Sequence, residues 1–200
     1  MSQSFLRPKD TRITADYYPT PVEAIDSIMD EIDPHTLSDS GYDTWLEPMA
    51  GDMRIYNRLP EGRREWAEIR EGRDYFAKPY PADNGITNPA FSIAEQAARK
   101  MLQDCRTVIL LQRLNWMGTQ KRREFWQANP PSHLFTLSKR PIFVKNCKAK
   151  KCRAALPLEH EGPCPVCGGK VGKGTDSTEY TWYAWDRNQI LKRRPGIYVI

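Results

Sequence analysis

The apolar residues of this chain recur with two periods, one typical of helices and one typical of strands. Between positions 22 and 32 they fall three or four residues apart and form a one-sided stripe: Val22, Ile25, Ile28, Met29 and Ile32. Just upstream, Thr20 is a candidate helix cap, Pro21 suits the first helical position, and Glu23 completes a capping box. The pattern therefore predicts an amphipathic helix that ends before Pro34.

Short apolar runs further along the chain predict strands. These runs are 44–47, 65–69, 107–112, 133–138 and 179–185, with helical patterns at 54–59, 92–101 and 119–127. Strands that alternate with helices indicate an α/β sheet. Only a short Pro-rich link separates the loop at 72–76 from Asn88. It leaves no room for a full additional strand-helix crossover, which needs about a dozen residues or more, so we expect a reduced sheet.

The segment 87–92, with the sequence Thr-Asn-Pro-Ala-Phe-Ser, falls at one of the predicted strand-to-helix junctions. Ser92 is a candidate cap for the helix that follows, with Glu95 three residues later. In open α/β sheets such junctions are where ligands bind, so Asn88, Pro89 and Phe91 are candidate site residues. Taken alone, an Asn-Pro pair also opens ordinary turns.

The composition is that of a globular protein, with 40% hydrophobic and 28% charged residues. A chain of 200 residues suits one domain, or one domain with a small insertion. No apolar run approaches the length of a membrane span, and the first residues lack the apolar core of a signal peptide. We therefore expect a cytoplasmic protein without a membrane partner.

The positive charges are clustered, although the net charge is only +5. One group contains Lys145, Lys148, Lys150, Lys151, Arg153, Lys170 and Lys173, and a second occupies positions 192–194. Clustered cations can follow a phosphate backbone, which makes nucleic acid the expected partner. A solvated surface with nothing bound is the alternative.

Four of the five cysteines form two pairs. Cys147 and Cys152 have four residues between them, whereas Cys164 and Cys167 have two and precede a pair of glycines. Without a secretory signal this spacing favours a metal over disulfides, and turns like the second aim two sulfurs at one tetrahedral ion. We predict a structural zinc site, because four thiolates leave no open coordination position.

Two other residues could be taken for metal ligands. We expect His160 to be an exposed loop residue and Cys105 to be a small buried hydrophobe. The cysteine segment, 146–171, is inserted between the last two predicted strands. It either contacts the substrate or serves as a stabilising clip on a long loop.

Four sequence motifs follow one another along the chain. They are Tyr18-Pro19-Thr20-Pro21, Glu47-Pro48-Met49-Ala50-Gly51-Asp52, the acidic pair Glu68 and Asp74, and Asn88-Pro89-Ala90-Phe91. In that order they resemble the motifs of compact adenine-N6 DNA methyltransferases, often carried by phages. The resemblance covers residues 17–92 and, more loosely, 106–144 and 172–186.

The resemblance implies an α/β fold: a reduced class I, Rossmann-like methyltransferase sheet with flanking helices and a small zinc-ribbon insertion. It divides the chain into an N-terminal arm (1–16), a methyltransferase domain (17–145 and 172–200) and the insertion (146–171). It also implies a bacterial or phage-infected host cell. The implied cofactor is S-adenosyl-L-methionine, bound by Tyr18, Thr20, Glu47, Pro48, Ala50, Gly51, Asp52, Glu68, Asp74, Tyr75 and Asn88.

The implied reaction is methyl transfer to adenine N6 in DNA, with Asn88, Pro89 and Phe91 as catalytic residues. The amine lone pair is delocalised into the ring, so two acceptors, the Asn88 side-chain oxygen and the Pro89 carbonyl, would take its hydrogens. The base would be flipped out of the duplex and would stack on Phe91. Nucleic acid is expected to contact Lys139, Arg140, Phe143, Lys148, Lys150, Lys151 and Arg153.

The sequence departs from the family pattern at two positions. Ala90 replaces a second proline, and Met53 replaces a second glycine, where it could crowd the cofactor. Two alternatives stay open. One is an amino-group methyltransferase acting on RNA or protein, because similar Asn-Pro motifs occur in those families. The other, suggested by Met53 and Ala90, is a non-catalytic nucleic-acid-binding protein on a degenerate methyltransferase fold.

Overall fold

The computed structural model describes residues 18–32, 43–152, 154–174 and 178–200. The predicted N-terminal arm, 1–16, and Arg153 lie outside these residues. No helix in the described ranges is long and apolar enough to cross a membrane.

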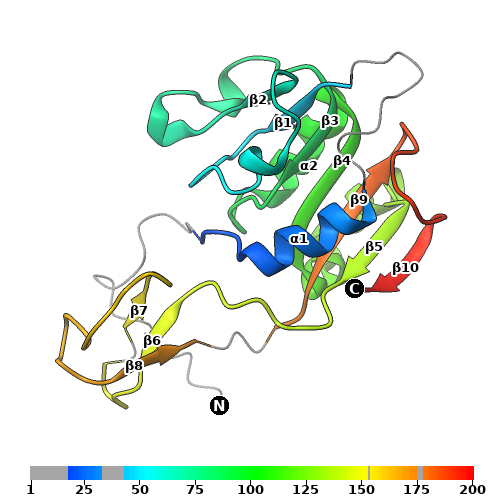
Figure 1. Ribbon diagram of the computed structural model, residues 1–200. Helices are drawn as coiled ribbons and strands as arrows, with labels where there is room; N and C mark the ends of the chain where they lie inside the picture. The colour runs from blue at the N-terminus through cyan, green and yellow to red at the C-terminus, as the bar shows by residue number, and fades with distance from the viewer. Residues whose placement is uncertain (1–17, 33–42, 153, 175–177) are drawn as a thin grey trace.

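Seven strands form the main sheet, in the order β10-β5-β9-β4-β3-β1-β2 (Figure 1). They are β1 (Trp45–Glu47), β2 (Arg64–Trp66), β3 (Ala82–Thr87), β4 (Cys105–Arg113), β5 (His133–Thr136), β9 (Tyr180–Asp186) and β10 (Gly196–Val199). Neighbouring strands are parallel except at β9, which runs antiparallel to both β4 and β5. The expected α/β fold class is confirmed.

The strand order reverses between β1 and β3. From β1 the chain moves outward to β2 and then returns to the opposite side of β1 to form β3. Such a reversal is the topological switch point of a Rossmann-like sheet, and ligands bind outside the carboxyl ends of its strands. Among the described residues no strand lies beyond β2, so the sheet is reduced at this edge, as expected.

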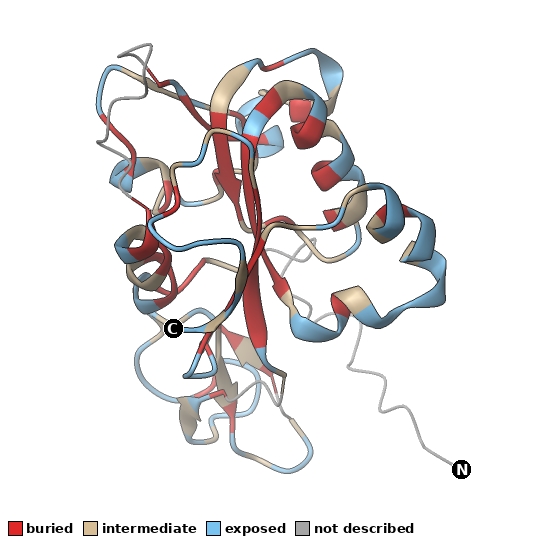
Figure 2. Ribbon diagram, turned by 90° about the vertical axis from the view of Figure 1, so that its right-hand side faces the viewer, coloured by how far each residue is buried: buried red, intermediate tan, exposed pale blue. Residues whose placement is uncertain are grey.

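Helices cover both faces of the sheet. Helix α1 (Val22–Glu31) packs on one face, whereas α2 (Ala94–Asp104) and α3 (Arg123–Ala128) pack on the other (Figures 1 and 2). Short 3-10 turns complete the main domain: η3 (Tyr56–Arg58), η4 (Ile69–Glu71), η5 (Tyr75–Ala77), η6 (Leu114–Gly118) and η7 (Gln120–Arg122).

Strand β4 is buried on both faces, which explains its continuous apolar sequence. Ile109 and Leu111 face the α1 side, whereas Val108 and Leu110 face the side of α2 and α3. This is the two-residue alternation of a strand, with an apolar layer on each face. The aromatic strand β9 follows the same rule.

The predicted helix caps are wrong. Helix α1 begins at Val22 with Pro21 as its N-cap, and no side chain caps it. Thr20 Oγ1 accepts a hydrogen bond from Asn88 Nδ2 instead. Helix α2 begins at Ala94 rather than beside Ser92, again without a side-chain cap. In both places the chain bends into the candidate site before it becomes helical.

Strand β10 was not predicted from the sequence. It lies at the sheet edge beside β5, with Ile197 and Val199 largely exposed. The alternation of Ile197 and Val199 with Tyr198 after a Pro-Gly pair is a strand signal that could have identified it.

The cysteine segment forms a small sheet of its own, in the order β7-β6-β8. Its strands are β6 (Lys145–Cys147), β7 (Ala155–Leu156) and β8 (Val171–Lys173), and it lies apart from the main sheet (Figure 1). In the chain it follows β5 and precedes β9. The division into a methyltransferase domain and an insertion at 146–171 stays a prediction.

Replacement of Ile28 by alanine should destabilise the protein by about 2–5 kcal/mol, because its side chain is fully buried between α1 and the sheet. Urea unfolding followed by circular dichroism measures this loss. The exposed Asp30 on the same helix is the control, and Asp30→Ala should change the free energy of unfolding by no more than about 0.5 kcal/mol. Equal effects at both positions would contradict the packing of α1.

Candidate functional site

A cavity of about 330 Å³ lies at the switch point, outside the carboxyl ends of β1 and β3. Four segments supply most of its lining: residues 18–20, the end of β1 with the loop after it, the loop after β2, and 88–93; Phe143, from a fifth segment, completes it. Of the predicted site residues it brings together Tyr18, Thr20, Glu47, Ala50, Gly51, Asp52, Glu68, Asn88, Pro89, Phe91 and Phe143.

One wall of the cavity is a hydrogen-bonded pair of loops. Gly51 has a φ of 55°, in the left-handed region that favours glycine, and its N–H donates to Glu68 Oε2 at 2.9 Å. The other Glu68 oxygen accepts from the backbone and side chain of Arg70, at 3.1 and 2.9 Å. Glu68 therefore fixes the loop after β1 against the loop after β2.

Glu47 ends β1 beneath this wall and is 2% exposed. Burial raises the pKa of its carboxyl group well above the ordinary value, and the nearby acids Asp52 and Glu68 add to this increase. The backbone N–H of Tyr56 donates to Glu47 Oε2 at 2.5 Å, and this hydrogen bond offsets part of the increase in pKa. The arrangement favours a protonated carboxyl group at this point.

Met53 has a strained backbone conformation, and its side chain does not occupy the cavity. Its φ is 67°, in the left-handed region where a residue with a Cβ pays about 1–2 kcal/mol, and it does not line the cavity. The concern that Met53 crowds a cofactor is therefore not supported. A glycine at this position would adopt the same φ without strain.

The amide of Asn88 has a defined orientation. Its Nδ2 donates to Thr20 Oγ1 at 3.0 Å and to the Tyr18 carbonyl at 3.3 Å, which uses both amide hydrogens. No described residue donates to its Oδ1. Asn88 therefore presents an acceptor at the cavity.

The Pro89 carbonyl is held by a residue that sequence reasoning missed. Gln112, near the end of β4 and 1% exposed, donates from Nε2 to this carbonyl at 3.0 Å. A carbonyl oxygen has a second lone pair, so it can still accept another hydrogen bond. Gln112 is a single amide near the end of an otherwise apolar strand, and this position is the sequence signal that could have identified it.

Aromatic rings form the far wall of the cavity. Phe91 lies 6.3 Å, between ring centroids, from both Tyr18 and Tyr180, and the Arg113 guanidinium lies 4.3 Å from its centroid. Phe143 packs against Tyr180 at 4.9 Å and is 7% exposed. Phe143 is thus part of the wall and the core, not of an exposed surface. Arg113 and Tyr180 pack against these rings but do not line the cavity themselves, and neither was singled out from the sequence.

Three predicted cofactor residues lie outside the cavity lining. Pro48 is buried behind the loop, and the Asp74 carboxylate accepts the Phe76 N–H at 2.9 Å at the start of η5. Tyr75 is 2% exposed and packs against Phe76 and Tyr80. Contact of these three residues with a cofactor stays a prediction.

The predicted nucleic-acid residues occupy two other places. Lys139 and Arg140 are exposed on the segment after β5 and do not line the cavity, and Arg140 pairs with Glu179. Lys148, Lys150 and Lys151 are exposed on the small sheet and its first turn. Binding of nucleic acid by these residues stays a prediction.

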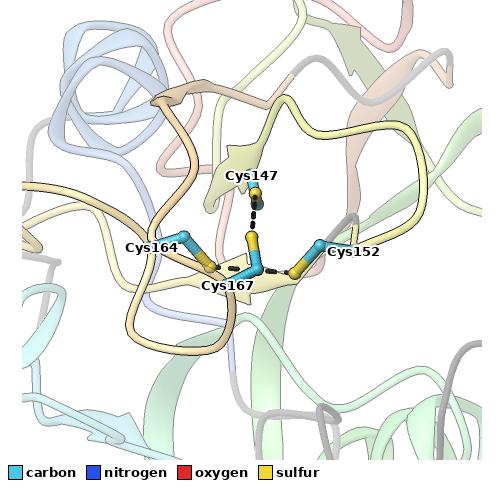
Figure 3. A group of neighbouring side chains, drawn as sticks. All are labelled: Cys147, Cys152, Cys164 and Cys167. Carbon is cyan, nitrogen blue, oxygen red and sulfur yellow. Dashed lines mark hydrogen bonds between the residues drawn. The ribbon is translucent and has the colours of Figure 1, made fainter.

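The four paired cysteines converge on one point (Figure 3). Their sulfur atoms all lie within 4.8 Å of one another, with Cys147 to Cys167 at 3.5 Å and Cys152 to Cys164 at 3.8 Å. A disulfide needs sulfurs about 2.05 Å apart. Four sulfurs about 2.3 Å from a central Zn²⁺ would be about 3.8 Å apart, so the cluster fits a tetrahedral metal site.

The turn around Cys164 supports thiolate formation. Burial acts to raise the pKa of the Cys164 thiol, but hydrogen bonds from the backbone of Val166 and Cys167 lower it to about 7. A Cβ at Gly169 would lie 3.2 Å from the Cys167 sulfur, so the second glycine after the pair gives the sulfurs room. His160 does not join the cluster; its ring contacts the Pro163 carbonyl.

Comparison with known proteins finds similarity of structure only. No family model and no curated protein matches the sequence. Among solved structures, a proposed RNA methyltransferase from Pyrococcus horikoshii is 12% identical, with a TM-score of 0.49 over 92% of this chain and 91% of that one. The precorrin-6y C5,15-methyltransferase from Geobacter metallireducens GS-15 is also 12% identical, with a TM-score of 0.47 over 90% of this chain and 100% of that one.

Glu47→Gln should change how stability depends on pH. Because the folded-state pKa of Glu47 is raised, the wild type loses stability as pH rises through the interval between the unfolded and folded values. The amide cannot ionise, so the variant lacks this loss. The variant should therefore be more stable relative to the wild type at about pH 8 than at about pH 5. Urea titrations at both pH values measure the difference, and an unchanged difference would contradict it.

Replacement of both Cys164 and Cys167 by serine should remove zinc, because two of the four sulfurs that converge are lost. Elemental analysis of purified protein should fall from about one zinc per chain to none. Cys105→Ala is the matched control: Cys105 is buried in β4, away from the cluster, and this variant should keep its metal. Stoichiometric zinc in the double variant would refute the ligand assignment.

Proposed function

We propose that this protein is a methyltransferase that uses S-adenosyl-L-methionine to methylate the exocyclic N6 amine of adenine in DNA. The observation that carries the proposal is the Asn88 amide. Its nitrogen is bound by Tyr18 and Thr20, so its oxygen is the atom that a substrate amine would meet. Pro89 lines the same cavity, and its carbonyl would be the second acceptor.

Two acceptors suit this chemistry because an aromatic amine is a poor nucleophile. Hydrogen bonds from the amine to Asn88 Oδ1 and the Pro89 carbonyl favour a pyramidal nitrogen whose lone pair points away from the ring. A nitrogen held in this way would bond to the methyl carbon of the cofactor as the carbon–sulfur bond breaks, and its extra proton would be lost to water. Orientation of this kind can lower a barrier by roughly 7–11 kcal/mol, so no strong base is required.

The opposite wall supplies groups for a nucleoside cofactor. Gly51 permits close approach of the backbone, and the Glu68 carboxylate lies at the end of β2, where it can accept ribose hydroxyl groups. When bound there, S-adenosyl-L-methionine would supply the methyl group. Phe91, on the aromatic wall, would stack on the extruded base.

A non-catalytic nucleic-acid-binding protein is the second candidate. The observation that favours it is that both Glu68 oxygens already accept hydrogen bonds, from Gly51 and from Arg70. A ribose would have to share or displace Arg70.

RNA and protein are the alternative substrates, since the same pair of acceptors could serve any planar amino group.

The test is incubation with methyl-labelled S-adenosyl-L-methionine and unmodified DNA, RNA or bulk protein, followed by digestion and identification of the modified unit. The wild type should produce N6-methyladenine in DNA. Asn88→Ala should reduce kcat by at least about 100-fold, because one of the two acceptors is lost. The exposed Asn57 is a matched control, and Asn57→Ala should retain activity.

Calorimetry with the cofactor separates the remaining outcomes. Glu68→Ala should weaken cofactor binding more than it lowers kcat at saturating cofactor. Asn88→Ala should lower kcat more than it weakens cofactor binding. A labelled nucleotide in RNA, or a labelled amino acid, would reassign the substrate. If the wild type binds no cofactor, the methyltransferase proposal fails and the non-catalytic candidate remains.

A further inference from the structure

A second hollow, of about 690 Å³, lies beside the candidate site. Its walls come from three places: the first turn of α1, the segment 137–142 after β5, and the small cysteine sheet with its loops. Arg54 lines both cavities and stands between them. The two hollows are therefore neighbours, and the small sheet closes the second one from the side.

Arg54 is fixed in this position. Its guanidinium binds Asp52 of the main domain at 2.7 Å and Glu159 of the cysteine segment at 2.6 Å. A backbone hydrogen bond at Glu159 and, to a smaller extent, the Arg54 guanidinium lower the pKa of the Glu159 carboxyl group below its usual value. These two ion pairs link the loop after β1 to the cysteine segment at the boundary between the two hollows.

The rim of the second hollow carries an excess of positive charge. Lys139, Arg140, Lys173 and Arg54 line it, against one acid, Glu23. Arg54 and Arg140 are paired with carboxylates, but within the described part of the chain no carboxylate pairs with Lys139 or Lys173. These two ammonium groups come from different parts of the fold and meet at one rim.

The floor of the hollow is apolar. Leu137, Pro141, Ile142 and Leu158 line it, and Val22, at 42% exposed, lies at its edge. An apolar floor beneath a cationic rim matches the two parts of a nucleotide, because a base has an apolar face and its phosphate is an anion.

We propose that this hollow is a second binding site, which takes the nucleotide next to the target base in a DNA strand. The flanking base lies on the apolar floor, and its phosphates contact Lys139 and Lys173. This inference rests on the proposed function for its substrate class. It adds a site for the strand outside the cavity that holds the methylated base, and it gives the cysteine segment a role as one wall of that site.

The test is binding of a short fluorescein-labelled, adenine-containing DNA oligonucleotide, measured by anisotropy over a series of salt concentrations without cofactor. The double variant Lys139→Ala, Lys173→Ala should bind about tenfold more weakly at low salt. Its plot of log affinity against log salt should be shallower by about 1 to 2, because each phosphate contact contributes about 0.7 in a single strand. Replacement of the flanking nucleosides by abasic units should also weaken binding to the wild type.

The matched control is Lys121→Ala, Arg123→Ala, two exposed cations next to α3 on the other face of the sheet. This variant should bind DNA as the wild type does. Equal losses in both double variants, or no loss in the first, would overturn the site. Cofactor binding, measured by calorimetry, distinguishes the two proposals. If DNA binding depends on Lys139 and Lys173 but the protein binds no cofactor, the methyltransferase proposal fails and the second binding site stands.

Discussion

The parallel pairing of β1 with β3 holds the two halves of the candidate site together. Trp45 lies opposite Asn84 and Leu46 opposite Gly85, so both strands end at the same edge of the sheet. The register is specified from the other end, where the buried Asn84 side chain bonds to Asp43 at 3.1 Å and to Asn188 at 3.0 Å. A one-residue slip would leave these buried polar groups without partners, which is costly.

This pairing decides what each half can contribute. The loop after β1 supplies backbone and carboxylate groups suited to a nucleoside, whereas the segment after β3 supplies acceptors suited to an amine. The link between them is Asn88, which also binds Tyr18 and Thr20 from the segment before α1. That segment lies far away in sequence, yet it orients the amide. The site is therefore an assembly of loops held by a rigid sheet, as binding sites in α/β proteins commonly are.

The sequence was most informative where one local pattern determined the structure. The stripe of α1, the apolar run of β4 and the spacing of the cysteines all predicted what the structure contains, because periodicity and ligand spacing are local properties. The helix caps failed because Thr20 and Ser92 lie where the chain bends into the cavity. Gln112 and Tyr180 were missed because their roles depend on strand neighbours distant in sequence, and the left-handed backbone at Met53 has no signature in its residue type.

The position of β9 has a consequence for the order of folding. This strand lies between β4 and β5, yet it is made after the whole cysteine segment, so the sheet cannot close until that segment is accommodated. The pairing of β6 with β8 brings the two ends of the insertion together, and Gly174 N–H donates to the Val144 carbonyl at 3.0 Å. A metal ion held by the cysteines would shorten the effective loop that β9 must close. The metal would then speed the insertion of β9 between β4 and β5, and the rate of refolding would depend on metal even though the candidate site lies elsewhere.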